Sequence, residues 1–336
     1  MSTFMSYNEQ GESMRCTALH HESYSVARHI AALFAILAGS FLGTVLPILG
    51  KRGDRFRVPD YVYAVGKSIA TGVVLGVAVI HMLEPANASL TSECLPDAIR
   101  NLSNPLAYMI CLAAVAAMHS LEACLRTFFE NRTASNFARV ESDENEHLLS
   151  CSDIGHHHHP VIYVDDPETT SGVNLLSAVF LELGVSLHSV FVGLTVGVCA
   201  DAELYTLVCA LCFHQFFEGV ALGSRLVEAS LTPKTEYVFS AVFVLSAPFG
   251  AAIGVMIVCE QLVNTNGSSY LLTQGLLDAV CAGILLYLGF QLLVSDFYSD
   301  LRAHSRGVRF PRLFLTAMLL GLWSGLVIMA LIGQYL

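Results

Sequence analysis

Charged residues are scarce in this sequence of 336 residues, at 13%, about half of the roughly 25% that soluble domains carry. A soluble core of this size needs a charged surface, and too few charged residues are present to form one. Positive charge is the scarcer sign, with 17 Lys and Arg against 28 Asp and Glu. The composition therefore excludes a soluble enzyme and a secreted disulfide scaffold as first interpretations, and the net charge of −11 argues against nucleic-acid binding.

Several sequence motifs of enzymes and pumps are also missing. No GxxxxGK[ST] loop occurs, so direct use of ATP is not supported. Neither HExxH nor GxSxG occurs, which weakens the interpretation as a membrane-embedded zinc-dependent hydrolase. No apolar segment supplies four cysteines for a closed structural zinc site.

Long apolar runs are abundant: 54% of the residues are hydrophobic, and the mean hydropathy is +0.59. A helix that crosses a hydrocarbon core of about 30 Å needs roughly 20 mostly apolar residues. Spanning backbone must satisfy its own hydrogen bonds, so each run is predicted to be helical. The sequence therefore predicts an all-α integral membrane protein with eight transmembrane helices, at 27–50, 61–84, 104–129, 173–198, 203–226, 236–259, 271–294 and 311–335.

Basic residues predict the orientation of these spans. They gather in the connections on one side, whereas the opposite connections near 85–103, 199–202 and 260–270 contain only Arg100. The positive-inside rule therefore places both termini outside. The predicted organisation is an extracellular tail (1–26), helices 1–3 (27–129), a cytoplasmic loop (130–172) and helices 4–8 (173–336).

The cytoplasmic loop 130–172 is polar, acidic and rich in histidine, so it is expected to be disordered. A disordered tract with several imidazoles can still bind zinc or similar cations. The loop is therefore either a solvated linker or a regulatory metal-binding segment, whose ligands would be His156, His157, His158 and His159. On the outer side, the sequence leaves open whether Cys16 and Cys94 form a disulfide.

Polar residues inside the spans point to a metal site. A charged group at mid-bilayer costs about 2.5–3.5 kcal/mol, so its presence needs a reason. His214 and Glu218 are four residues apart on one helical face, where both can ligate one ion. His188 and His214 begin the matching patterns His188-Ser-Val-Phe-Val-Gly193 and His214-Gln-Phe-Phe-Glu-Gly219. Their glycines would let the two helices approach until the histidines converge, and imidazole with carboxylate suits Zn²⁺ or Fe²⁺.

These motifs resemble those of the ZIP (Zrt/Irt-like protein) family of metal-ion transporters. The fourth-span signature is Glu182-Leu-Gly-Val-Ser-Leu-His188-Ser-Val-Phe-Val-Gly193, and the fifth-span motif is His214-Gln-Phe-Phe-Glu218-Gly219. The resemblance implies a ZIP-type helix bundle in which His188, His214 and Glu218 are the transport ligands. Ser189 and Gln215 match positions that help to hold a second metal in prokaryotic members, but both are neutral here, which favours one principal site. His81 and Glu84 form either part of the entrance path or a solvated pair at the interface.

The resemblance further implies uptake of Zn²⁺ or Fe²⁺ into the cytoplasm by alternating access, at the plasma membrane and often as a homodimer. No prosthetic group is expected, because the metal ion is the transported substrate. An intramembrane hydrolase that uses an open metal position is the main alternative. A zinc exporter would need fewer spans and a site richer in carboxylates.

Overall fold

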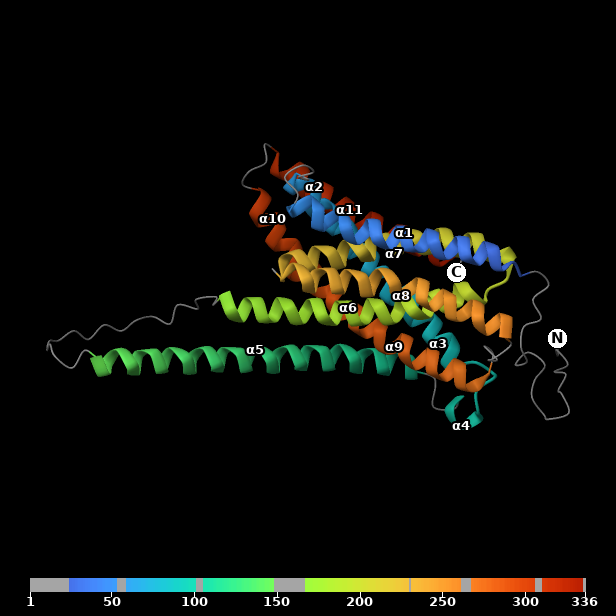
Figure 1. The fold of residues 1–336 in the computed structure, drawn as a ribbon, viewed down its shortest axis with the longest axis horizontal. Coiled ribbons are helices and arrows are strands. Elements are labelled where there is room, and N and C mark those ends of the chain that lie inside the picture. The colour runs from blue at the N-terminus through green and yellow to red at the C-terminus, as the bar shows by residue number, and fades with distance from the viewer. Residues whose placement is uncertain are drawn as a thin grey trace.

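The structure is a computed structural model that describes residues 24–52, 59–100, 105–147, 167–229, 231–260, 267–305 and 310–334. Helices account for all the regular secondary structure within these ranges, and eight of the helical segments are long and apolar enough to cross a membrane. The predicted all-α class with eight spans is therefore confirmed. Figure 1 shows the helices running roughly along one direction, with the start of the first span and the end of the last span at the same end of the bundle. We call this the outer end, after the predicted orientation, and the opposite one the inner end.

Two of the spans are composite, because a short π-helix interrupts each of them. The elements in chain order are α1 (Val26–Arg52), α2 (Asp60–Gly76), the π-helix η2 (Val77–Leu83), α3 (Glu84–Leu90), α4 (Asp97–Arg100), α5 (Leu106–His147), α6 (Pro167–Val198), α7 (Asp201–Glu228), α8 (Pro233–Glu260), α9 (Ser268–Gln291), the π-helix η3 (Leu292–Asp296), α10 (Phe297–Ser305) and α11 (Pro311–Gly333).

The spans group into two bundles. In the first bundle α6 packs along α8 and α1 packs along α7, while α1 also contacts α8. In the second bundle α2 packs along α11, and α9 packs along α5, η2 and α3. The two bundles meet through α2 with α7, α6 with α9, and α5 with α6. A site at the junction of these helices is therefore shared by both bundles.

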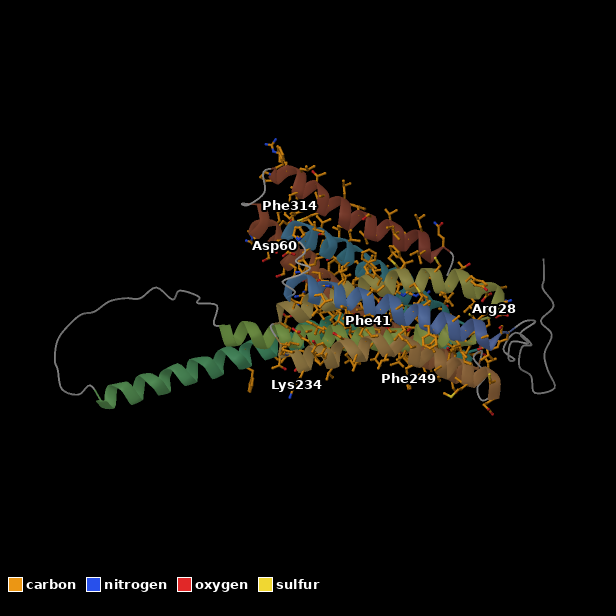
Figure 2. The ribbon with its side chains drawn as sticks, turned by 45° about the horizontal axis from the view of Figure 1, so that its top comes forward. Arg28, Phe41, Asp60, Lys234, Phe249 and Phe314 are labelled. Atoms are coloured by element: carbon orange, nitrogen blue, oxygen red, sulfur yellow. The ribbon has the colours of Figure 1, made fainter. Side chains whose placement is uncertain are left out.

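The surface of the bundle between its two ends is apolar, as expected for helices that face lipid. Phe41 and Phe249 are 52% and 60% exposed and lie along its flanks. Charged side chains are found at both ends: Figure 2 shows Arg28 at one end, and Asp60 and Lys234 toward the other. This distribution agrees with the scarcity of charge in the sequence.

The glycines of the two matching motifs do permit close packing, but with partners other than those predicted. A Cβ atom on Gly193 would lie 2.0 Å from the carbonyl oxygen of Ala247 on α8, and one on Gly219 would lie 2.8 Å from the backbone nitrogen of Thr44 on α1. The expectation that these glycines bring the two histidine-bearing helices together is therefore wrong. They instead fix α6 on α8 and α7 on α1, within the first bundle.

Helices also extend beyond the predicted spans. α5 continues to His147, so the first part of segment 130–172 is helical where a disordered loop was expected. The physical reason is that residues 130–147 contain neither Pro nor Gly, so a helix that starts in the membrane continues past its surface. The expected disorder stays a prediction for 148–166, which lies outside the described residues.

Polar contacts tie the start of α1 to the α6–α7 turn at the outer end. The Tyr24 hydroxyl donates to the carbonyl oxygen of Gly197 at 2.6 Å, and Arg28 pairs with Asp201 at 3.3 Å. Burial raises the pKa of the Tyr24 phenol to about 12, so the hydroxyl remains a donor at neutral pH. Between them, His29 lies within hydrogen-bonding distance of the Ser25 carbonyl oxygen through Nδ1.

Candidate metal centre

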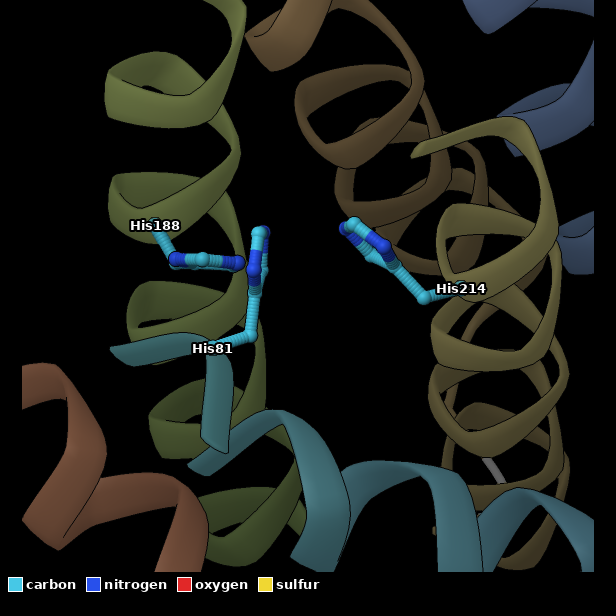
Figure 3. Close-up of side chains that lie close together, drawn as sticks. All are labelled: His81, His188 and His214. Atoms are coloured by element: carbon cyan, nitrogen blue, oxygen red, sulfur yellow. The ribbon is translucent and has the colours of Figure 1, made fainter. Parts of the chain in front are cut away.

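Three histidines from three helical segments converge inside the bundle. His81 comes from η2, His188 from α6 and His214 from α7, and Figure 3 shows their rings turned toward a common space. Each ring offers one nitrogen such that the three nitrogens lie within 4.8 Å of one another. The ring centroid of His81 is 5.6 Å from that of His188 and 4.8 Å from that of His214. This spacing allows all three imidazoles to bind one ion after small side-chain movements.

The position of His81 depends on the π-helix that carries it. Pro85 follows four residues later, and a proline ring clashes with the carbonyl group of residue i−4 in an α-helix. The chain avoids this clash by widening over Val77–Leu83, where the N–H of Glu84 donates to the carbonyl oxygen of Val79, five residues earlier. Such π-bulges are frequent at functional sites because they redirect side chains. Here the bulge presents His81 to the histidines of the first bundle.

The three histidines are largely buried inside the bundle. His188 and His214 are 2% and 0% exposed, and His81 is partly buried. Each of the three rings has a buried nitrogen without a hydrogen-bond partner among the described residues. Buried polar atoms without partners are rare and call for an explanation, such as an ion. A neutral imidazole nitrogen is a common ligand of zinc and iron.

Glu218, predicted as the third ligand, lies outside this group of three. Its carboxylate is fully buried one helical turn after His214, on the inner side of the cluster, and both oxygens lack a hydrogen-bond partner among the described residues. The structure thus brings His188 and His214 close together, with His81 as the third member of the group and Glu218 outside it. Glu218 is placed to meet a cation one turn further toward the inner end.

Ser189 and Gln215 satisfy each other. Both are fully buried, and the Gln215 Nε2 donates to the Ser189 Oγ at 3.0 Å. This bond links α6 to α7 beside the histidines. Because neutral side chains that already bond each other are poor ligands for a second cation, the arrangement agrees with one principal metal position.

A cavity of about 180 Å³ borders the cluster on its outer side. His81 and His188 form part of its wall, and the acidic residues Glu84 and Asp278 line it as well. Glu84 is exposed, whereas Asp278 is 6% exposed. The sequence associated His81 and Glu84 with an entrance path but gave Asp278 no role. Only the fold places Asp278 of α9 in the same cavity as η2 and α6.

Two predicted features lie partly or wholly outside the described residues. The histidine run His156, His157, His158 and His159 falls within 148–166, so the regulatory metal-binding loop stays a prediction. Cys94 is disulfide-bonded. Cys16, the candidate partner that the sequence left open, belongs to the N-terminal segment that the structure does not describe.

Eight spans around a buried cluster of imidazoles define a polytopic membrane protein suited to divalent cations. Residues 26–333 match the family model described as ZIP Zinc transporter, so the chain belongs to the ZIP family. It is 30% identical over 312 residues to "Zinc transporter 5" of Oryza sativa subsp. japonica. The aligned region covers 91% of this chain and 87% of that relative. It is 32% identical over 308 residues to "Fe(2+) transport protein 2" of the same organism, covering 83% of this chain and 80% of that relative.

Proposed function

We propose that this protein moves Zn²⁺ or Fe²⁺ across the membrane through the cluster of His81, His188 and His214. The observation that carries the proposal is the convergence of three imidazole nitrogens within 4.8 Å inside a bundle of membrane-spanning helices. Membership of the ZIP family, and relatives named as zinc and Fe(2+) transporters, support the same substrates. Imidazole ligands suit both ions, so the donor set favours neither.

The proposed path of the cation has three stages: the outer cavity, the histidine cluster and Glu218. Glu84 and Asp278 attract the cation into the outer cavity, where it keeps part of its water shell. The three histidines then replace water ligands without adding charge to the buried site, and Glu218 offers a carboxylate one turn further inward. Ser189 and Gln215 hold α6 and α7 in register rather than binding a second ion.

Alternating access is supported by the division of the site between the two bundles. His188 and His214 belong to the first bundle and His81 to the second, so a relative movement of the bundles separates His81 from its partners. Loss of one ligand weakens binding and favours release. The family resemblance supports uptake into the cytoplasm and a homodimer in the plasma membrane.

A membrane-embedded hydrolase is the alternative function. It would also use a buried metal with an open coordination position. Neither the family description nor the names of the relatives quoted above refer to hydrolysis, and we therefore propose a transporter that is not an enzyme.

Flux of radiolabelled metal into proteoliposomes tests the proposal. The reconstituted protein is expected to move Zn²⁺ or Fe²⁺ down its gradient, and His188→Ala is expected to abolish the movement. His119→Ala is the matched control, because His119 lies in span α5 beside Tyr287 and outside the cluster. Normal flux through His188→Ala, or no flux through the unmodified protein, would refute the proposal.

A further inference from the structure

A group of charged side chains lies between the two bundles on the inner side of the metal site. The Lys67 Nζ is 3.0 Å from the Asp296 Oδ2 and 3.4 Å from the Asp300 Oδ2. The Arg225 Nη1 is 3.4 Å from the same Asp296 oxygen. These side chains are largely buried, with between 5% and 18% of their surface exposed. Buried charges are costly unless they are paired. Removing one partner would leave the other charge buried without compensation, so the pairs hold these four side chains together.

The contacts in this group differ in which bundle they join. Lys67 of α2, Asp296 of η3 and Asp300 of α10 all belong to composite spans of the second bundle, so the lysine contacts are internal to it. Arg225 belongs to α7 of the first bundle. The contact between Arg225 and Asp296 therefore crosses from one bundle to the other, as the histidine cluster does.

The crossing ion pair lies on the opposite side of the cluster from the outer cavity. Arg225 follows His214 by eleven residues on α7, which is about 16 Å toward the inner end. The cavity with Glu84 and Asp278 lies on the other side of the histidines. The structure thus combines a cavity on the outer side of the histidines with an ion pair that joins the bundles on their inner side.

We infer that the Arg225–Asp296 ion pair is an inner latch that holds the transporter in its outward-open state. The inference rests on the proposed function, since a latch has a purpose only in a protein that alternates. Separation of the bundles at the inner end lets water reach both charges, and hydration offsets the lost pairing, so the latch can open reversibly. Lys67 keeps Asp296 and Asp300 paired during this step, so one contact breaks while the carboxylates stay in place.

The test measures accessibility of the outer cavity without any metal. Thr195 lines that cavity and is partly exposed, so Thr195→Cys reports its opening to a membrane-impermeant thiol reagent added from outside. Modification of the protein that lacks this substitution is subtracted to remove the contribution of native cysteines. In the Thr195→Cys protein, Arg225→Gln is expected to lower the ratio of outward-open to inward-open molecules about tenfold. The modification rate is proportional to the outward-open fraction, so it falls about fivefold where the two states of the Thr195→Cys protein are equally populated.

Matched variants separate the latch from a general effect of charge or folding. Asp296→Asn removes the other partner and is expected to have the same effect, with no further loss in the double variant. Arg225→Lys keeps the charge and is expected to retain most of the modification rate. Arg302→Gln removes an exposed inner-end charge, whose Nε bonds only within its own helix among the contacts described, and should match the unmodified protein.

The latch is overturned if Arg225→Gln and Asp296→Asn are both modified at the rate of Arg302→Gln, or if their effects add in the double variant. It is also overturned if Arg225→Lys behaves as Arg225→Gln. Because this assay contains no metal, failure of the latch and failure of metal transport are distinguishable: a latch confirmed here with no flux would overturn the proposed substrate alone.

Discussion

Substitution of His81 by alanine tests the composition of the metal site most directly. The residue supplies one of three imidazoles whose ligand nitrogens lie within 4.8 Å of one another. Structural zinc sites with four ligands bind with about 10–16 kcal/mol, or about 2.5–4 kcal/mol for each ligand. Loss of His81 is therefore expected to weaken Zn²⁺ binding by about two to three orders of magnitude.

The assay is an equilibrium titration of purified protein in lipid nanodiscs, with a chromogenic chelator as the competitor for Zn²⁺. Binding of Co²⁺, followed by its visible absorption, reports whether nitrogen ligands are lost. His119→Ala is the control, since it removes an imidazole of another span without touching the cluster. His119→Ala is expected to bind Zn²⁺ with the affinity of the unmodified protein.

The two possible ligand sets predict opposite rankings of His81→Ala and Glu218→Gln by their loss of Zn²⁺ affinity. If the site is His81, His188 and His214, then His81→Ala weakens binding more than Glu218→Gln does, because the carboxylate lies outside the group. If the site is the set suggested by the sequence motifs, Glu218→Gln has the larger effect. A Zn²⁺ affinity of His81→Ala equal to that of His119→Ala would refute the assignment of His81.

Three further predictions concern packing, access and the outer end. Gly193→Ala is expected to reduce the yield of folded protein in size-exclusion chromatography, because its Cβ would lie 2.0 Å from a carbonyl oxygen of α8, whereas Gly66→Ala meets nothing within 4 Å and should be tolerated. Asp278→Asn is expected to raise the metal concentration for half-maximal flux with little change in the maximal rate, because the variant removes a charge that attracts the cation into the cavity. Tyr24→Phe is expected to cost about 1 kcal/mol of stability in thermal unfolding. Since the folded phenol has a raised pKa of about 12 against an ordinary value of 10.0, that difference persists below pH 10 and disappears as the pH rises toward 12.

The spans could be predicted from the sequence because the length and apolar character of a membrane helix are local properties. All eight predicted runs correspond to helical spans. The ends of these helices were less predictable. α5 continues to His147 because nothing in the following residues breaks a helix, and hydropathy does not detect a helix that leaves the membrane.

The histidine cluster was partly predictable for a related reason. His188 and His214 stand out because each is a costly polar residue in an apolar run, and their motifs match. Which residue completes the group depends on the packing of a distant span. Helical spacing favoured Glu218, one turn from His214, whereas the fold brings His81 from more than 100 residues earlier in the chain. Asp278 had no local signal that distinguished a cavity residue from any other buried carboxylate.

The sequence did contain one signal for His81, which is the proline four residues after it. Pro85 lacks an N–H and would clash with the His81 carbonyl group in a regular α-helix, so the chain forms the π-helix Val77–Leu83 instead. One residue inserted into a helix rotates all preceding side chains by about 100° relative to those that follow. The direction of His81 toward the other two histidines therefore depends on a residue that binds no metal.

Pro85→Ala is expected to weaken Zn²⁺ binding although all three imidazoles remain. Alanine restores the N–H and removes the clash, so α2 can continue as a regular α-helix and turn His81 away from His188 and His214. The measurement is the same nanodisc titration, with Pro311→Ala as the control, because a proline in the first turn of α11 replaces an N–H that has no helical partner. An affinity unchanged by Pro85→Ala would show that packing of η2 against α9, rather than the proline, holds the π-helix in place.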